Sequence, residues 1–379
     1  MADQPRNEGQ KGLIDRVLTN DLCTGCSACV HLCPYFEHYM DSTVTLHSCD
    51  SESGRCHAYC PRTPTDLFLL LERLFDPADL SPEMGAVKGL FMTRASDKTL
   101  RADAQHGGTV SALMMLALSE KIIDTAILAD QDDDHLSEAS GVKAPEDVAM
   151  KAGTKFVVSP TVGVFTDIAK GEARRIGVVA TPCQALALAK MRTAPDDLDK
   201  ERVEKLKLVI GLFCGWALSW RELKALLEEK FKGAKILGLD IPPSKHQCME
   251  VTTDRGIAEI SMDEVQSCVR KNCDYCFDMT CEFADISVGS ARSPEGWNVD
   301  KGWNQVIVRT ELGRKLLELA REKGVLEFKA VPGGNLEKLK RASMNKKRTC
   351  LKNLAEKSGR PDDLIYLKTD DPAVKAVRG

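Results

Sequence analysis

This chain of 379 residues contains fifteen cysteines, and their spacing indicates the chemistry that it could perform. The tightest group, Cys23, Cys26, Cys29 and Cys33, has the spacing C-x2-C-x2-C-x3-C and is followed by Pro34. This spacing is typical of [4Fe-4S] sites, in which three close thiolates bind one cube and the fourth reaches another cluster. Zinc or disulfides are the alternatives, but zinc sites rarely use this spacing and nothing in the sequence suggests export. We therefore expect iron-sulfur ligands here.

The fourth ligand of the first cube, cluster I, must come from further along the chain. A second motif, Cys56-x3-Cys60-Pro61, repeats the end of the first one. Because the first motif supplies only three ligands to its own cube, the second motif is the natural source of the missing one. The ligands predicted for cluster I are Cys23, Cys26, Cys29 and Cys60.

A second N-terminal cluster, cluster II, is less regular. The cysteines that remain for it are Cys33, Cys49 and Cys56. A regular motif would space its first three cysteines two residues apart, but residues 50–55 contain no thiol, so one ligand is missing. Three interpretations stay open: a cube with three cysteine ligands, a fourth ligand from His47 or His57, or no second cluster.

Composition and charge narrow the class of protein. A hydrophobic fraction of 43% and a charged fraction of 28% are those of a globular protein, and the net charge of −4 gives no electrostatic reason to expect nucleic acid. No apolar run approaches the roughly 20 residues that span a bilayer, so no membrane span is predicted. The polar N-terminus has no signal peptide character. Many cysteines without export indicate metal or redox chemistry, and we expect a cytoplasmic protein.

The elements that must position the cysteines change in character along the chain. Residues 66–75 predict a helix, and a proline-bearing linker follows. From residue 87 strands and helices alternate, which predicts an α/β fold with a mixed, largely parallel sheet. Residues 130–144 resemble a solvated loop and residues 156–159 a strand. The predicted parts are a flexible tail (1–20), a ferredoxin-like iron-sulfur domain (21–80), an α/β domain (86–332) and a C-terminal helix and tail (333–379).

A second group of thiols lies in the α/β region. Cys183 and Cys214 each follow a predicted strand, and ligands in open α/β sheets gather beyond the carboxyl ends of strands. Cys273-x2-Cys276 supplies two more thiols, so four thiolates from three segments could close another [4Fe-4S] cluster. The alternative is that Cys183 and Cys214 are small core residues.

Several ordered segments of this region resemble one known family, the beta subunit of coenzyme F420-reducing hydrogenase and its relatives in formate dehydrogenases and F420H2 oxidoreductases. The resemblance runs from about residue 87 to about residue 329, and the cysteine-rich segment ahead of it is similar to the input subunit of F420H2 dehydrogenases. The segments are 105–110 (QHGGTV), 152–155 (AGTK), 181–184 (TPCQ), 210–214 (IGLFC), 273–276 (CDYC), 284–290 (ADISVGS) and 293–297 (SPEGW).

The resemblance implies a flavoprotein with FAD in the α/β domain and two to three [4Fe-4S] clusters in all. It implies that Cys183, Cys214, Cys273 and Cys276 hold the internal cluster. A glycine turn before a helix leaves backbone N–H groups free to bind the flavin pyrophosphate, although without the family it would be read as a helix-entry turn. The residues expected to contact the flavin are Gly107, Gly108, Thr109, Lys155, Ser159, Thr181, Gln184, Ser290 and Ser293.

The sequence departs from the family pattern in three places. His106 stands where the family commonly has an acidic residue, and residues 298–303 form an insertion in a loop that could face the hydride carrier. Cys268 and Cys281 flank the internal motif as extra thiols. They are either spare or substitutes for one of the four ligands.

The predicted function is a converter between hydride and single-electron chemistry. FAD can take two electrons from a hydride carrier, F420 or NAD(P)H, and release them singly to iron-sulfur clusters, so no protein acid or base is required. The expected partners are ferredoxin or other redox subunits, such as a hydrogenase, a formate dehydrogenase, a heterodisulfide reductase-like or a quinone-reducing complex. Two alternatives are a flavin-free electron relay and a ferredoxin-dependent reductase of an organic substrate.

Overall fold

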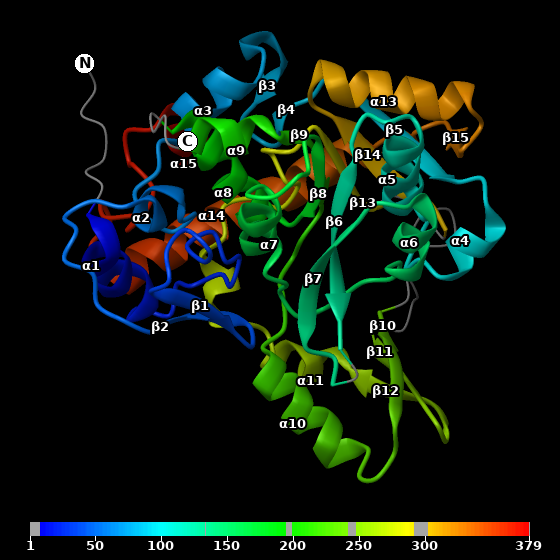
Figure 1. The fold of residues 1–379 in the computed structure, drawn as a ribbon, viewed down its shortest axis with the longest axis horizontal. Coiled ribbons are helices and arrows are strands. Elements are labelled where there is room, and N and C mark those ends of the chain that lie inside the picture. Colours follow the sequence, from blue (N-terminus) through cyan, green and yellow to red (C-terminus); the bar gives the residue numbers. More distant parts are fainter. Residues whose placement is uncertain (1–7, 133, 195–198, 242–247, 292–301, 379) are drawn as a thin grey trace.

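An eight-stranded sheet forms the centre of the computed structural model (Figure 1), which describes residues 8–132, 134–194, 199–241, 248–291 and 302–378. Its strands are β5 (Gly89–Ala95), β6 (Thr125–Gln131), β7 (Ser137–Val142), β8 (Ile176–Ala180), β9 (Leu206–Leu212), β13 (Ile286–Ser290), β14 (Asn304–Val308) and β15 (Leu326–Lys329). Their spatial order is β15-β5-β14-β13-β9-β8-β6-β7.

The sheet is mixed, and one direction dominates. Strands β13, β9, β8 and β6 pair in parallel, whereas β7 and β14 pair antiparallel to their neighbours. Strand β5 is antiparallel to β14, so it runs with the four central strands, and β15 runs against it. Five of the eight strands therefore share one direction, and the prediction of an α/β fold with a largely parallel sheet is confirmed.

Two predicted elements within the sheet region are wrong. The predicted loop 130–144 contains β7, which pairs with β6 over its whole length. Its sequence, SEASGV, lacks the alternating apolar residues of a typical strand. A strand at the sheet edge that buries few side chains does not need them. The predicted strand 156–159 is reduced to one bridge between Val157 and Leu218.

Helices cover both faces of the sheet, because apolar side chains of its central strands point alternately to one face and to the other. In β8, Val178 belongs to the core on one face and Val179 to the core on the other. The first face is covered by α7 (Thr161–Ile168), α8 (Pro182–Thr193) and α9 (Lys200–Glu204), and the second by α5 (Thr109–Ser119), α6 (Pro145–Met150) and α13 (Glu311–Glu322).

The N-terminal segment packs beside α8 at the left of Figure 1. Its elements are α1 (Gly9–Leu13), a π-helical turn (Ile14–Leu18), β1 (Phe36–Tyr39), β2 (Ser42–Thr45), α2 (Arg55–Tyr59) and α3 (Leu67–Leu74). The sequence predicts a flexible tail over residues 1–20, whereas residues 9–18 are helical. Leu13 and Val17, one helical turn apart, are buried in the core around the first cysteines, which explains the difference.

A smaller unit projects from the lower part of Figure 1. It consists of α10 (Trp220–Lys230), β10 (Ile236–Asp240), β11 (Cys248–Thr253), β12 (Gly256–Ser261) and α11 (Met262–Ser267). The three strands form an antiparallel sheet, as the short strands and turns in this part of the sequence predict. Short elements elsewhere are β3 (Leu80–Ser81), β4 (Gly85–Ala86), α4 (Lys98–Ala102) and the 3-10 turns η2 (Pro77–Asp79) and η4 (Lys271–Tyr275).

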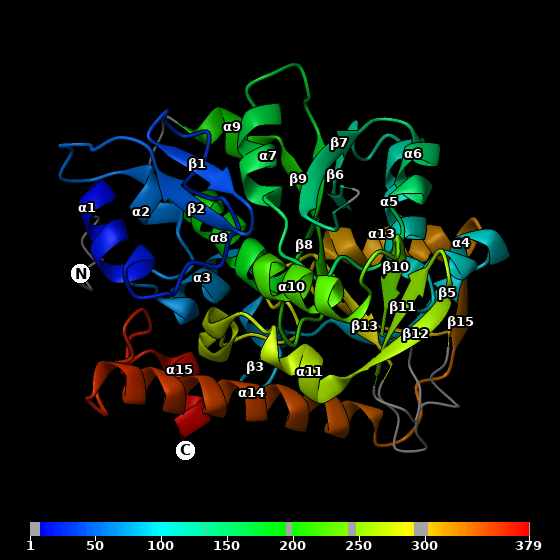
Figure 2. The same ribbon diagram turned by 90° about the horizontal axis from the view of Figure 1, so that it is seen from below.

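The C-terminal part wraps back over the molecule. Helix α14 (Asn335–Ser358) runs along its underside in Figure 2, and α15 (Pro372–Arg378) contacts α3. One buried core joins residues from Cys26 to Val377, so the predicted parts of the chain pack as one body, and their division into domains stays a prediction.

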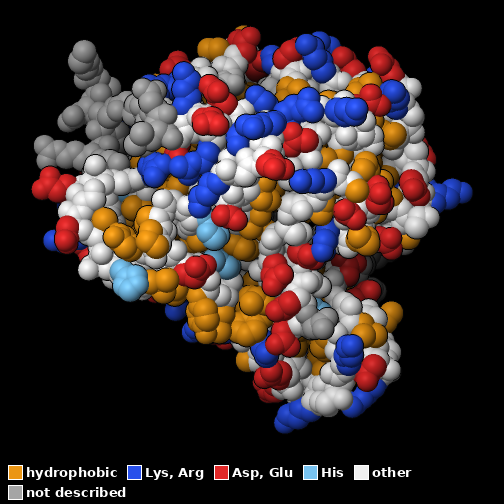
Figure 3. All heavy atoms as spheres, viewed as in Figure 1, with side chains coloured by type: hydrophobic (Ala, Val, Ile, Leu, Met, Phe, Trp, Pro, Cys, Tyr) orange, Lys and Arg blue, Asp and Glu red, His pale blue; other side chains and the backbone are white. Residues whose placement is uncertain are grey.

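The described surface shows two further features. Among the helices of the described ranges, none is long and apolar enough to cross a bilayer. On the face shown in Figure 3, basic and acidic side chains are interspersed, which matches the small net charge.

Candidate functional site

The predicted site residues gather along one edge of the central sheet. Strands β5, β8, β9 and β13 run in one direction, so their carboxyl ends meet at this edge. Thr181 follows β8, Cys214 lies just beyond β9 and Ser290 ends β13. At the end of β5 the Ala95 N–H donates to the Gly107 carbonyl at 2.7 Å. The thiols and the glycine turn thus share the edge at which α/β proteins bind ligands.

The four internal thiols come together from α8, the end of β9 and the turn η4. Burial raises the pKa of the Cys214 thiol; Lys346 opposes this rise, and the nearby thiols of Cys273, Cys183 and Cys276 add to it. A small apolar cavity lies directly beside Cys183 and Cys276. The structure therefore brings together the set expected for the internal cluster.

The thiols predicted for cluster I form a second group. Burial raises the pKa of the Cys29 thiol, and repulsion from Cys23, Cys60 and Cys26 raises it further. Four thiolates this close in a dry site repel one another, so a bound cation or cluster is needed to keep them charged.

The thiols predicted for cluster II form a third group nearer the surface. Burial raises the pKa of the Cys56 thiol to about 11, and the thiols of Cys33 and Cys49 contribute. Gln10 fixes the loop, because its side chain donates to the His47 carbonyl at 2.8 Å and accepts from the Cys49 N–H at 2.6 Å. The fourth ligand stays open between the alternatives given above.

The donor set fits iron-sulfur cubes. Three of the cysteine sulfurs accept a hydrogen bond from a backbone N–H group. The Gly25 N–H donates to Cys23 (3.4 Å), the Arg62 N–H to Cys60 (3.4 Å) and the Ala217 N–H to Cys273 (3.3 Å). Such bonds favour the thiolate and tune cluster potentials. Within the described ranges no three His, Cys, Asp or Glu side chains converge as ligands of a single ion would. Ligands of a cube bind separate irons and stand further apart.

Three basic side chains lie beside the thiol groups, and the sequence did not single them out. The Lys190 ammonium on α8 donates to the Cys60 carbonyl at 2.7 Å, and burial lowers its pKa to about 8. The Lys346 ammonium on α14 donates to the Cys214 carbonyl at 2.9 Å. Arg62, only 4% exposed, lines the cavity beside the internal thiols. These positive charges offset part of the negative charge that a thiolate-bound cluster brings.

The extra thiols lie in packed cores. The Cys268 thiol donates to the Glu264 carbonyl at 3.7 Å in the core of the projecting unit. The Cys281 thiol is fully buried and directed at the Ala180 carbonyl, 3.5 Å away. The thiols of Cys183 and Cys214 are among the groups that raise the pKa of Cys281, so Cys281 stays open as a substitute ligand, whereas Cys268 lies in a separate core.

The residues predicted to bind the flavin pyrophosphate meet at the N-terminus of α5. Gly108 has a φ of 72°, which only glycine adopts freely, and the Thr109 N–H donates to the Asn304 side-chain oxygen at 3.2 Å. A Cβ on Gly107 would lie 2.7 Å from that same oxygen. The Ser290 hydroxyl and His106 Nε2 are 2.5 Å apart. Asn304, at the start of β14, and His106 thus contribute polar groups at this turn, although neither was among the predicted flavin contacts.

The other predicted flavin contacts have structural partners in this structure. Thr181 and Gln184 form the capping box of α8, and the Gln184 side chain donates to the Ser159 carbonyl at 2.8 Å. The Lys155 ammonium donates to the carbonyls of Lys151 at 3.0 Å and Ala152 at 2.8 Å, at the end of α6. The remaining predicted contact, Ser293, lies outside the described residues.

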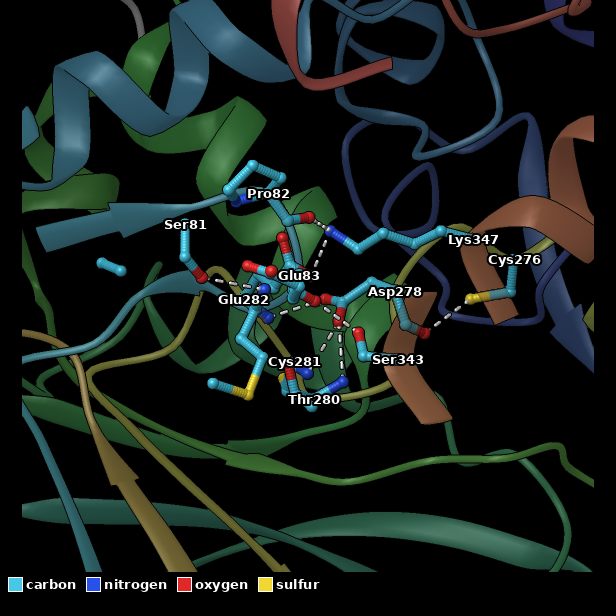
Figure 4. A network of polar contacts seen from close by, with 12 residues as sticks. Ser81, Pro82, Glu83, Cys276, Asp278, Thr280, Cys281, Glu282, Ser343 and Lys347 are labelled. Carbon is cyan, nitrogen blue, oxygen red and sulfur yellow. Dashed lines mark hydrogen bonds and ion pairs between the residues drawn. The ribbon is translucent and has the colours of Figure 1, made fainter. Parts of the chain in front are cut away.

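Helix α14 also contacts the segment that carries the internal thiols (Figure 4). The Lys347 ammonium lies 2.7 Å from the Glu282 carboxylate and donates to the Pro82 carbonyl at 2.9 Å. Burial raises the pKa of Glu282 to about 7, and Lys347 opposes the rise. The Cys276 thiol donates to the Asp278 carbonyl at 3.2 Å, four residues before Glu282. The buried Lys347–Glu282 ion pair therefore supports the segment that carries Cys276.

Known proteins resemble the chain over most of its length. Residues 90–166 match the family model for the N-terminal part of the coenzyme F420 hydrogenase/dehydrogenase beta subunit, and residues 173–333 match the model for its C-terminal part. The coenzyme F420 hydrogenase subunit beta of Methanococcus voltae is 32% identical over 282 residues, which are 72% of this chain and 96% of the relative. One subunit of the F(420)H(2) dehydrogenase of Methanosarcina mazei is 27% identical over 86% of this chain and 92% of its own.

A solved structure supports the same assignment. In the F420-reducing [NiFe] hydrogenase complex from Methanosarcina barkeri, one chain superimposes with a TM-score of 0.64 and 26% identity. The match covers 73% of this chain and 94% of that chain. The two family models, the relatives and the fold agree, and this chain belongs to the family of coenzyme F420 hydrogenase/dehydrogenase beta subunits, which are components of oxidoreductases.

Proposed function

We propose that this chain transfers electrons between a two-electron hydride carrier and one-electron iron-sulfur partners, with FAD and [4Fe-4S] clusters as its cofactors. The observation that supports this most is the shared edge of the sheet. The glycine turn and the internal thiols lie along it, and the cluster I thiols adjoin them through Cys26 and Cys183. A hydride site and a series of electron carriers are thereby next to one another.

Each cofactor has residues suited to it. FAD, when bound, supplies the exchange between hydride and single electrons. Gly107 and Gly108 form the turn at the start of α5, where a helix N-terminus favours an anion, and Ser290 and His106 offer polar groups beside it. The internal thiols, with Lys346 behind Cys214, hold the cluster that would receive electrons first.

Coenzyme F420 is the carrier we favour. The relatives at 32% and 27% identity are both named for F420 chemistry, and they match 96% and 92% of their own lengths. A nicotinamide remains the alternative for an organism without F420. The partners we propose are other redox subunits of the kinds given above, or ferredoxin.

Anaerobic purification of the full chain tests the proposal. Two to three cubes predict about 8–12 irons per chain, with sulfide in the same amount and one FAD. Addition of F420H2 should then bleach the flavin band before the clusters are reduced, and NADPH should do so far more slowly. Iron without flavin would favour the relay, and reduction of neither cofactor by either donor would favour an organic substrate. Protein with neither flavin nor iron would contradict the proposal.

A further inference from the structure

Two buried arginines connect the N-terminal cysteines to the turn η4, at which Cys273 and Cys276 lie. Arg62 directly follows the second cysteine motif and reaches toward η4. Arg270 directly precedes η4 and reaches toward the first cysteine loop, residues 22–30. Arg62 is 4% exposed, and the side chain of Arg270 is 9% exposed. The two contacts therefore run in opposite directions between the same two parts of the chain.

The Arg62 guanidinium holds the turn by two of its carbonyls. It donates to the Asn272 carbonyl at 3.2 Å and to the Tyr275 carbonyl at 2.6 Å. These residues directly precede the two cysteines of the turn. The Arg62 backbone N–H donates to the Cys60 sulfur at 3.4 Å. One residue thus contacts a predicted ligand of cluster I with its backbone and the neighbours of two internal thiols with its side chain.

The Arg270 guanidinium makes the reciprocal contacts. It donates to the Cys23 carbonyl at 2.8 Å and to the Asp41 carbonyl at 2.6 Å, and it pairs with the Asp41 carboxylate at 2.6 Å. A Cβ on Gly25 would lie 2.3 Å from the Asp41 carbonyl oxygen, so the first cysteine loop packs tightly there. The Arg270 Nε donates to the Asn272 side-chain oxygen at 2.9 Å. Both arginines therefore meet at this asparagine.

Arginine is suited to such a contact. Its planar guanidinium has five N–H donors in a fixed fork, so one side chain can bind carbonyls of two residues at once. Its loss would leave buried carbonyls without a donor, which is costly. Arg62 also lines the small cavity beside Cys183 and Cys276, so it lies next to a third segment of the internal thiol group. The two arginines therefore bear on the backbone around several predicted ligands.

Other contacts between the N-terminal segment and the α/β region end on helices. The Lys190 ammonium on α8 donates to the Cys60 carbonyl at 2.7 Å. Arg55 on α2 donates to the Asp199 carboxylate at 2.7 Å, just before α9. These contacts dock the N-terminal segment on the α/β region. The contacts of Arg62 and Arg270 differ because they bind the turn at which two predicted ligands lie.

We propose that Arg62 and Arg270 are positioning residues that fix the internal thiol turn against the N-terminal cysteines and so set the arrangement of the two thiol groups. The inference deepens the proposed function and rests on it, because the thiols are the expected cluster ligands. The contacts are reciprocal. A substitution at Arg62 should therefore loosen η4, and a substitution at Arg270 should loosen the first cysteine loop.

Arg62→Met and Arg270→Met remove the guanidinium and keep an unbranched side chain. Full-length protein, prepared anaerobically, is analysed by hydrogen-exchange mass spectrometry. In Arg62→Met the backbone amides of residues 271–278 should exchange about tenfold faster, as expected when a charged hydrogen-bond donor is lost. In Arg270→Met the same increase should appear in residues 22–30. Exchange at the parent rate in these segments would overturn the proposal.

Arg55→Met is the matched control, because it also removes an arginine contact between the N-terminal segment and the α/β region, but at Asp199. It should leave exchange in residues 271–278 at the parent rate. If it accelerates exchange there as much as Arg62→Met does, the effect is a general loosening and the positioning role is wrong.

Arg62→Lys tests whether geometry matters beyond charge. The variant keeps the positive charge, but a single ammonium replaces the fork, so exchange in η4 should lie between the parent and Arg62→Met. Arg62→Lys and Arg270→Lys also make the test if a methionine variant fails to fold, with the same pattern at a smaller size. Exchange at the parent rate in both lysine variants would contradict a positioning role that depends on the fork.

Spectroscopy separates this inference from the proposed function. In a parent protein that holds its clusters, Arg62→Lys should keep its iron but change the electron paramagnetic resonance spectrum of the reduced protein, whereas Arg55→Met should keep the parent spectrum. Parent spectra in both variants would overturn the positioning role. A parent protein without iron would overturn the proposed function, and the exchange pattern, which needs no bound iron, would still decide whether the arginines fix the turn.

Discussion

The two ends of the sheet edge differ in how they hold their predicted residues. At the thiol end, eight cysteines gather into two neighbouring groups, with the ammonium groups of Lys190 and Lys346 behind them. The residues expected to contact the flavin instead separate into the α5 turn, Lys155 at the end of α6 and the α8 cap, which also carries Cys183. The predicted metal ligands thus gather as groups, whereas the expected flavin contacts are spread over several elements and also stabilise helix ends.

The comparison predicts that the two ends can be damaged independently, and Cys183→Ser should show the largest effect. Loss of one internal ligand should remove about four irons per chain, because a cube needs its cysteine thiolates. FAD should remain, since the expected pyrophosphate site at the α5 turn is formed by other segments of the chain. Iron and flavin analysis of anaerobic protein measures both. Cys268→Ser, at a buried thiol in the projecting unit, should keep all its iron; equal iron loss in both variants would contradict the assignment.

Gly107→Ala should have the opposite effect, with loss of FAD and retention of iron. Its Cβ would lie 2.7 Å from the Asn304 side-chain oxygen and 3.0 Å from the Arg94 Cβ, so the turn must open. We expect most of the FAD to be lost on purification while the iron content stays at the parent level. Gly333→Ala is the control, because nothing lies within 4 Å of its added Cβ. Normal flavin content in Gly107→Ala would place the flavin elsewhere.

Two lysines of α14 compare a buried ion pair at the thiol end with an exposed ion pair on the same helix. Lys347→Met leaves the Glu282 carboxylate buried without its partner, which should cost about 3–5 kcal/mol in the free energy of unfolding. Lys352→Met, which removes an exposed partner of Glu356, should cost no more than about 1 kcal/mol. Urea unfolding under reducing, anaerobic conditions measures both. Similar losses would show that the buried pair adds nothing special to the thiol end.

The same pair should give the thiol end a pH dependence. The folded Glu282 carboxyl has a pKa of about 7, above the ordinary value of 4.5, chiefly because it is buried. Between these values the folded chain holds a proton that the unfolded chain has released. Stability from this group is therefore present below 4.5 and is lost as the pH rises through about 7. Glu282→Gln should flatten this part of the stability profile; an unchanged slope would assign the dependence to other groups.

The smallest effect is expected at Lys155. Its ammonium satisfies carbonyls at the end of α6, so Lys155→Met should cost about 1 kcal/mol of stability through the lost hydrogen bonds. FAD content should not change if helix capping is its main role. Loss of flavin without loss of stability would instead support the contact that the sequence predicts.

The cysteine groups could be predicted because ligand spacing and positions after strands are local features of a sequence. Cys183 and Cys214 follow buried strands, and parallel strands bring their carboxyl ends together. Lys190 and Lys346 could not be predicted, since a lysine has the same local signal whether it lies beside a predicted metal ligand or faces water. Strand β7 was missed for a related reason: its edge position, not its composition, makes it a strand.

The C-terminal helix has a practical consequence for anyone who shortens this protein. The matched family region ends at residue 333, whereas α14 begins at Asn335 and supplies Lys346 and Lys347. Expression limits drawn at the family boundary would therefore remove two basic side chains that contact Cys214 and the segment after Cys276. A shortened chain that failed to load iron would then be an artefact of where it was cut, and would say little about the protein's chemistry.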